Sequence, residues 1–305
     1  RSLLLYYFNE AEAQKENRRL IARGRGIASM GLTEYDQAVQ YFTEALELSD
    51  GWVQNVDYDM NYYLAAAYRK NGQPAEAKKV YDAILGLKPE EKDAYFLRGS
   101  AELELGDYES AKADFDKAIS MDPKNYDRLI EIYEALADYG NREVGQEYLQ
   151  NVLNTAKQLD AYDSGRIYYY LGDYQKAYLA LEEAKGKGGV DSYLYLGKAY
   201  AATGDYNYAS SVYSNYLSKQ GPDAEIYNQL GLCEMAKKDY QKALEAFQAG
   251  KQIEGNSLMQ TLSFNEIVAY EYLQDYQKAA VLLNAYLQNY PDEPTYFAEW
   301  ASLDL

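Results

Sequence analysis

The chain has 305 residues, of which 48 are acidic and 30 basic, so its formal net charge is -18. It has no histidine and one cysteine, which excludes imidazole catalysis, zinc sites built on histidine and an intrachain disulfide. The negative charge argues against nucleic-acid binding because it repels phosphates, and 36 tyrosines are too many for an acidic disordered chain.

The predicted elements begin with a helix in residues 1–18. A repeating pattern follows in residues 19–293, and a last helix is predicted for residues 294–305. The repeat is marked by an acidic residue, a tyrosine and, three positions after the tyrosine, an alanine, as in Asp107, Tyr108 and Ala111. Its eight anchor positions, two of them in degenerate copies, are 38, 77, 111, 145, 177, 209, 243 and 279.

Residues 92–125 show most clearly what one repeat predicts. Gly106 divides two helical runs, and glycine accepts the left-handed conformation that ends a helix. Asp107 comes next, and its carboxylate can cap the following helix. A glycine inside a helix costs about 1 kcal/mol relative to alanine, so Gly99 indicates that its helix closely approaches Ala111. Each repeat therefore predicts two antiparallel helices.

This pattern resembles the tetratricopeptide repeat family, whose unit of about 34 residues is a pair of antiparallel helices. The resemblance implies an all-α fold: a right-handed α-α superhelix, or solenoid, of about eight helix pairs in residues 19–293. One repeat cannot bury its own apolar face, so residues 1–18 and 294–305 are expected to be N-terminal and C-terminal capping helices. In the best copy the resemblance rests on Tyr95, Gly99, Gly106, Tyr108, Ala111, Phe115, Ala118 and Pro123.

The resemblance also implies a binding surface, because the first helix of each pair lines the concave side in this family. Tyrosines at these positions are not expected to be needed for the core of the helix pair. Acids recur there as well, although acids in a first turn also complement the helix dipole; both interpretations stay open. The candidate ligand-binding residues are Tyr62, Tyr63, Asp93, Phe96, Asp127, Glu131, Glu134, Tyr162, Arg166, Tyr169, Tyr195 and Lys198.

A groove of tyrosines and carboxylates suits a neutral or basic peptide, since aromatic faces also attract cations. We therefore expect a non-enzymatic scaffold whose partners are proteins or peptides. The alternative is a cell-envelope protein that binds a small cationic or carbohydrate ligand. Chaperone-binding members of the family clamp a C-terminal carboxylate with cationic side chains. The equivalent positions here include Asp93 and Leu97, so that function is not expected.

Other candidate chemistry is weak. Residues 185–189 lack the spacing of a phosphate loop, and the run Asp57, Asp59, Asn61 lacks the glycine of a calcium loop. We expect no catalytic residues, no cofactor and no metal.

The expected location is the bacterial cell envelope. No apolar stretch approaches the roughly 18 residues of a transmembrane helix. The start at Arg1 and the acidic, histidine-free composition resemble the mature parts of bacterial envelope lipoproteins with such repeats. We therefore expect export, with a cytoplasmic location as the alternative.

Overall fold

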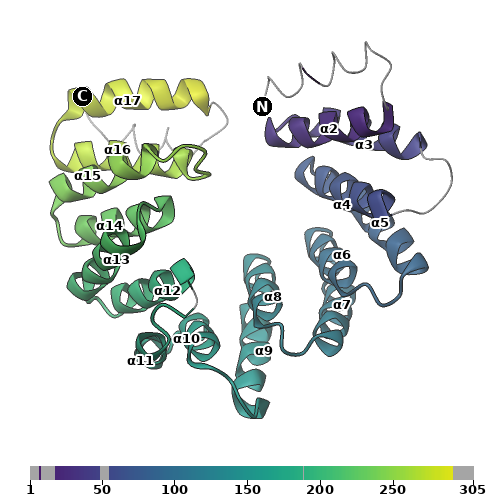
Figure 1. Cartoon of the computed structure of the whole chain (residues 1–305), viewed down its shortest axis with the longest axis horizontal. Helices are drawn as coiled ribbons and strands as arrows, with labels where there is room; N and C mark the ends of the chain where they lie inside the picture. Colours follow the sequence, from purple (N-terminus) through teal and green to yellow (C-terminus); the bar gives the residue numbers. More distant parts are fainter. Residues whose placement is uncertain (1–6, 8–17, 49–54, 188, 291–305) are drawn as a thin grey trace. The chain divides into compact units, whose positions relative to one another are not determined.

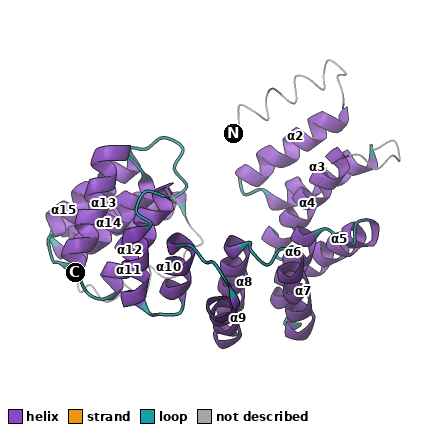
Figure 2. Ribbon diagram, turned by 60° about the horizontal axis from the view of Figure 1, so that its bottom comes forward, coloured by secondary structure: helices purple, strands orange, loops and turns teal. Residues whose placement is uncertain are grey.

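The computed structural model describes residues 7, 18–48, 55–187 and 189–290. Within these ranges the chain forms sixteen α-helices and no strand (Figures 1 and 2). The capping helices expected at 1–18 and 294–305 lie outside the described residues, apart from Tyr7 and Arg18. The helices are α2 (Arg18–Gly31), α3 (Tyr35–Glu47), α4 (Asn55–Lys70), α5 (Pro74–Leu87), α6 (Lys92–Glu104), α7 (Tyr108–Met121), α8 (Tyr126–Asp138), α9 (Arg142–Thr155), α10 (Ala161–Tyr170), α11 (Tyr174–Glu183), α12 (Gly189–Ala202), α13 (Tyr206–Gln220), α14 (Ala224–Ala236), α15 (Tyr240–Lys251), α16 (Met259–Tyr272) and α17 (Tyr276–Asn289).

Consecutive helices pack on one another in chain order, from α2 to α8 and again from α10 to α17. First helices of successive pairs also touch, namely α2 with α4, α6 with α8, α10 with α12 and α12 with α14. This is the packing of a solenoid of helix pairs, so the expected fold class is confirmed. No helix in the described residues is long and apolar enough to cross a membrane.

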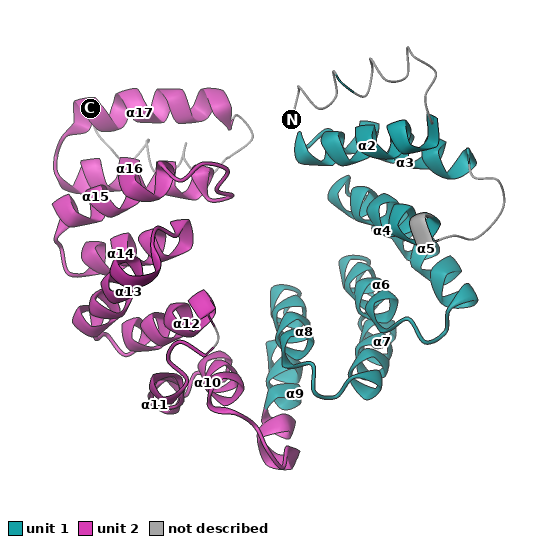
Figure 3. Ribbon diagram, in the orientation of Figure 1, with its two compact units in different colours: residues 1–149 teal, residues 150–305 magenta. Residues whose placement is uncertain are grey.

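The chain divides into two compact units, residues 1–149 and residues 150–305, coloured separately in Figure 3. The boundary falls within α9. Unit 1 therefore contains α2 to α8, and unit 2 contains α10 to α17. The single continuous solenoid expected for residues 19–293 stays a prediction.

The repeated alanines form the centre of each helix pair, and the seven alanine anchors in the described residues are all buried. In five of the pairs in the described residues, a large side chain one turn after the anchor packs against a glycine in the middle of the first helix. In the fourth pair the sizes are exchanged, because Gly145 of α9 lies against Tyr133 of α8. The glycine contacts elsewhere are Gly26 with Phe42, Gly99 with Phe115, Gly165 with Leu181, Gly197 with Tyr213 and Gly231 with Phe247.

The turn inside the third pair follows the expected chemistry. Gly106 has a φ of 77°, and the carboxylate of Asp107 accepts a hydrogen bond from the Ser110 N–H at 3.3 Å. In the seventh pair the glycine position is occupied by Lys238, with a φ of 64°. This conformation costs a residue with a Cβ roughly 1 kcal/mol or more. The seventh turn is therefore less favourable than the third.

Lys238→Gly is expected to raise the free energy of unfolding by about 0.5–1 kcal/mol, because glycine adopts the left-handed conformation without the Cβ penalty. Thermal unfolding followed by circular dichroism measures the change. The matched control is Gly106→Lys, which should destabilise the chain by a similar amount. A Lys238→Gly protein with the same midpoint as the parent would contradict the argument.

Candidate functional site

A pocket of about 980 Å³ lies on the surface of α4 in unit 1. Tyr62, Tyr63 and Ala66 of α4 line its middle, together with Leu97 of α6. Two of these, Tyr62 and Tyr63, are candidates from the sequence. Tyr63 is 38% exposed, and its ring stacks on Phe42 with a centroid distance of 5.5 Å. The pocket therefore presents an aromatic surface, in which Phe42 packs against the ring of Tyr63 and fixes its position.

Charged side chains stand at both ends of this pocket. Asp59 lies at one end, 3.9 Å from Arg23 of α2. At the other end are Lys70 and Arg69, and the Arg69 Nε donates a hydrogen bond of 2.8 Å to Glu104 of α6. The Arg69–Glu104 pair joins two successive first helices, which fixes the width of the pocket at that end.

Two tyrosines that line the pocket keep their protons at neutral pH. Burial raises the pKa of Tyr81 to about 12, although the neighbouring Arg69 guanidinium opposes the shift. Burial also raises the pKa of Tyr62, and the carboxylate of Glu91 adds to the effect. The Tyr62 hydroxyl is buried and makes no hydrogen bond within the described part of the chain. Both rings therefore act as neutral surfaces.

A second junction in unit 1 is centred on Arg128 of α8. Its guanidinium lies 2.7 Å from the carboxylate of Asp93 on α6 and 3.1 Å from that of Glu131. It also lies 4.0 Å from the centroid of the Phe96 ring. Arg128 was not a candidate from the sequence, yet it contacts three residues that were: Asp93, Phe96 and Glu131. The sequence did contain a signal for it: Arg128 directly follows Asp127, which occupies the position equivalent to Asp93 in the next repeat.

Unit 2 holds a cluster of tyrosines on α10 and α12. The Arg166 guanidinium lies 4.3 Å from the centroid of the Tyr162 ring. The rings of Tyr169 and Tyr195 meet edge to face, with their centroids 5.6 Å apart. Lys198 lies 5.9 Å from the Tyr195 centroid, and its ammonium is 3.7 Å from Glu225 of α14. Five candidates therefore gather in this unit, with cations already placed over two rings.

The remaining candidates, Asp127 and Glu134, are exposed on α8. The expectation that aromatic side chains of this face do not serve the core is wrong for several of them, because they are partly buried against core clusters. These rings are covered because neighbouring helix pairs stack on one another, and this stacking buries the sides of the first helices. The residues concerned are Tyr62, Phe96, Tyr162, Tyr169 and Tyr195.

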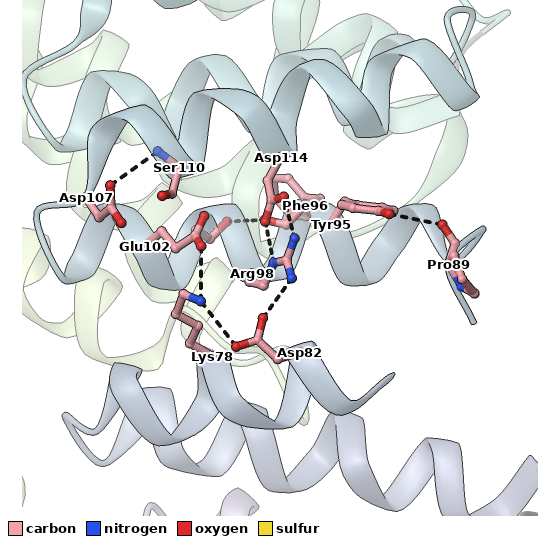
Figure 4. A network of polar contacts seen from close by, with 11 residues as sticks. Lys78, Asp82, Pro89, Tyr95, Phe96, Arg98, Glu102, Asp107, Ser110 and Asp114 are labelled. Atoms are coloured by element: carbon pink, nitrogen blue, oxygen red, sulfur yellow. Dashed lines mark hydrogen bonds and ion pairs between the residues drawn. The ribbon is translucent and has the colours of Figure 1, made fainter. Parts of the chain in front are cut away.

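A partly buried charge network links α5, α6 and α7 (Figure 4). Arg98 donates hydrogen bonds of 2.6 and 2.7 Å to the two carboxylate oxygens of Asp114, and one of 2.7 Å to Asp82. Lys78 lies 3.5 Å from the carboxylate of Glu102. Burial, followed by the nearby Asp114 charge, raises the pKa of Glu102 to about 7.

A raised carboxyl pKa is typical of general acids and bases. Glu102, however, is only 3% exposed and its carboxylate lies beside Lys78, so we interpret the network as structural. Among the described residues, no three side chains of histidine, cysteine, aspartate or glutamate gather as metal ligands. The absence of catalysis and of a metal in the whole chain stays a prediction.

Comparison with protein families agrees with the geometry. A tetratricopeptide repeat model matches residues 23–77, 62–126 and 194–257, and a second model of this repeat matches residues 264–293. The chain is a tetratricopeptide repeat protein.

Two relatives of this tetratricopeptide repeat protein are named for chaperone systems. It is 30% identical over 105 residues to the Hsp70-Hsp90 organizing protein of Triticum aestivum, covering 34% of this chain and 17% of that protein. It is 29% identical over 100 residues to a heat-shock protein cognate co-chaperone of Aspergillus fumigatus, covering 33% of this chain and 28% of that protein. The matches span less than a third of either relative.

Among solved structures, a tetratricopeptide repeat protein from Parabacteroides merdae aligns with a TM-score of 0.52 and 14% sequence identity. The alignment covers 83% of this chain and 98% of that one. At this identity the likeness concerns the fold alone.

Proposed function

We propose that this tetratricopeptide repeat protein is a non-enzymatic scaffold that binds a peptide or protein segment on the surface of its first helices. The observation that carries the proposal is the preformed surface of unit 1. There the Arg69–Glu104 and Asp93–Arg128 pairs tie successive first helices together beside an aromatic pocket. A surface that is ordered before binding loses less conformational entropy when a partner arrives.

A neutral or basic segment fits this surface best. The net charge of -18 attracts basic partners over long distances. Exposed carboxylates of Asp127, Glu131 and Glu134 lie on α8. Several acids of this surface lie in ion pairs, such as Asp93 and Glu131 with Arg128 and Glu225 with Lys198. The ion pairs offset part of the charge and the exposed carboxylates of α8 add to it, so both neutral and basic segments suit this surface.

We do not extend the chaperone-related function in the relatives' names to this chain. A cationic clamp for a C-terminal carboxylate requires lysine or arginine at repeat positions that Asp93 and Leu97 occupy here. We therefore propose a protein partner without assigning it to a chaperone system.

The alternative function is binding of a small cationic or carbohydrate ligand by an envelope protein. The tyrosine cluster of unit 2 supports it, since aromatic faces bind cations. Against a cationic ligand, Arg166 and Lys198 already lie over the rings of Tyr162 and Tyr195. A cation would have to displace them, so we place this function second.

Selection of random twelve-residue peptides displayed on phage, with residues 1–305 as the immobilised target, tests the proposal. Enriched peptides should bind a Glu131→Lys, Glu134→Lys protein about three- to tenfold more weakly, since each reversed charge is worth up to about 1 kcal/mol. The matched control reverses Glu143 and Glu147, which are also exposed and lie about one helical turn apart on α9.

Equal weakening by the α8 and α9 reversals would contradict binding at the first-helix surface. Failure to enrich any peptide would contradict the scaffold proposal, and saturation by tetramethylammonium or glucose would favour the alternative.

We also propose export to the bacterial envelope, with the cytoplasm as the alternative. The acidic, histidine-free composition supports it. Fractionation of the native host, with detection by an antibody against this chain, tests the location. Recovery in the cytoplasmic fraction would contradict it.

A further inference from the structure

The pocket of unit 1 runs along one face of α4. Asp59, Tyr62, Ala66 and Lys70 all line it, at spacings of three or four residues. The two charged ends, Asp59 and Lys70, lie eleven positions apart in the sequence. At about 1.5 Å of rise per residue, this distance is about 16 Å along the helix axis. The pocket is therefore a trough with Asp59 near one end and, near the other, Lys70 beside the Arg69–Glu104 ion pair.

The middle of the trough is apolar. Tyr62, Tyr63 and Ala66 form its floor, and Leu97 forms part of the α6 wall. Aromatic and aliphatic surfaces of this kind stabilise a large apolar side chain by removing it from water. The volume of about 980 Å³ lies at the upper end of the range for small-molecule pockets, roughly 300–1,000 Å³. It accommodates several residues of an extended chain.

The two ends differ in charge. Lys70 is exposed and has no ion-pair partner among the described residues, while its neighbour Arg69 is neutralised by Glu104. Asp59 has a side chain that is 64% exposed, and its 3.9 Å contact with Arg23 is at the outer limit for an ion pair. One end therefore accepts an acidic group, and the other has a carboxylate oxygen open to a second cation.

We propose that this trough recognises an extended segment of a protein partner that carries a basic and an acidic side chain about five residues apart, with a large apolar side chain between them. An extended chain rises about 3.3 Å per residue, so about five residues span the distance between Asp59 and Lys70. The segment is neutral overall, in accord with the proposed function on which this inference rests.

The test compares selections from the twelve-residue peptide library against the parent chain and two single variants. The parent should enrich the motif of basic, apolar and acidic residues. Lys70→Glu should replace the acidic residue of the motif by a basic one, and Asp59→Lys should replace its basic residue by an acidic one. A peptide from the parent selection should bind each variant about three- to tenfold more weakly.

Two reversals outside the trough serve as controls. Glu90→Lys and Lys124→Glu change exposed residues in the turns before α6 and α8, and both should retain the parent motif with less than a twofold change in affinity. Circular dichroism verifies the fold of every variant. If Lys70→Glu is unfolded, Lys70→Gln replaces it and should lose the acidic preference without gaining a basic one.

One motif enriched by all five proteins would overturn this inference and leave the scaffold proposal standing. Motifs without the charged pair would overturn it as well. Failure to enrich any peptide would overturn both.

Discussion

Gly99→Leu is expected to lower the free energy of unfolding by about 1–3 kcal/mol, the range for overpacking a well-filled core. A Cβ added at this glycine would stand 2.8 Å from the Phe115 ring and 3.1 Å from the Ala111 carbonyl oxygen. The carbonyl belongs to the backbone of α7, so rotating the phenylalanine cannot relieve the whole contact. Urea unfolding followed by circular dichroism measures the loss.

The matched control for this change is Gly86→Leu. Gly86 lies in α5, and a Cβ there would meet no atom within 4 Å. Because leucine has the higher helix propensity, the control should be unchanged or more stable by up to about 1 kcal/mol. Equal destabilisation by both substitutions would show that close approach at Gly99 is not the cause.

Glu102→Gln is expected to change how stability depends on pH. The pKa of Glu102 is raised to about 7 in the folded chain from an ordinary value of 4.5. The stability it contributes is therefore fully present below pH 4.5 and is lost as pH rises to 7. Glutamine has no charge to bury, so relative to the parent the variant should gain about 1–3 kcal/mol between pH 4.5 and pH 8.

Glu234→Gln is the repeat-matched control for this measurement. Glu234 of α14 occupies the position equivalent to Glu102 and lies 2.8 Å from Lys237. The position equivalent to Asp114 is Ala246, so the second carboxylate is missing. Urea unfolding at pH 4.5, 6 and 8 measures the pH dependence of stability for the parent and for both variants. A parent and a Glu102→Gln variant that respond identically to pH would contradict the argument.

The helix pairs were predictable because their signals are local and repeated. Gly106 and Asp107 mark the end of one helix and the cap of the next within two residues. Phe115 follows Ala111 by one helical turn, so their shared face is visible in the sequence. Lys238 stands where other repeats have the turn glycine, but the flanking residues match the repeat pattern, and the structure has the same turn there.

The candidate surface was predictable only in part. Repeat phase placed Tyr62 and Tyr63 on one helix face, and the structure brings them together in the α4 pocket. Position within the repeat did not reveal that Arg128 binds Asp93 or that Arg69 binds Glu104, because the partners in each pair are 35 residues apart in the sequence. Only the stacking of helix pairs sets such distances. Whether the candidate residues bind a partner stays a prediction.

The sequence by itself determined the all-α class, the positions of the helix pairs and the residues at their centres, since capping, turn formation and helical periodicity act over a few neighbouring residues. The tertiary structure decided which charges are paired, where the trough on α4 opens and why the pKa of Glu102 is raised. These properties depend on the desolvation and the interatomic distances that arise when separate helices pack together.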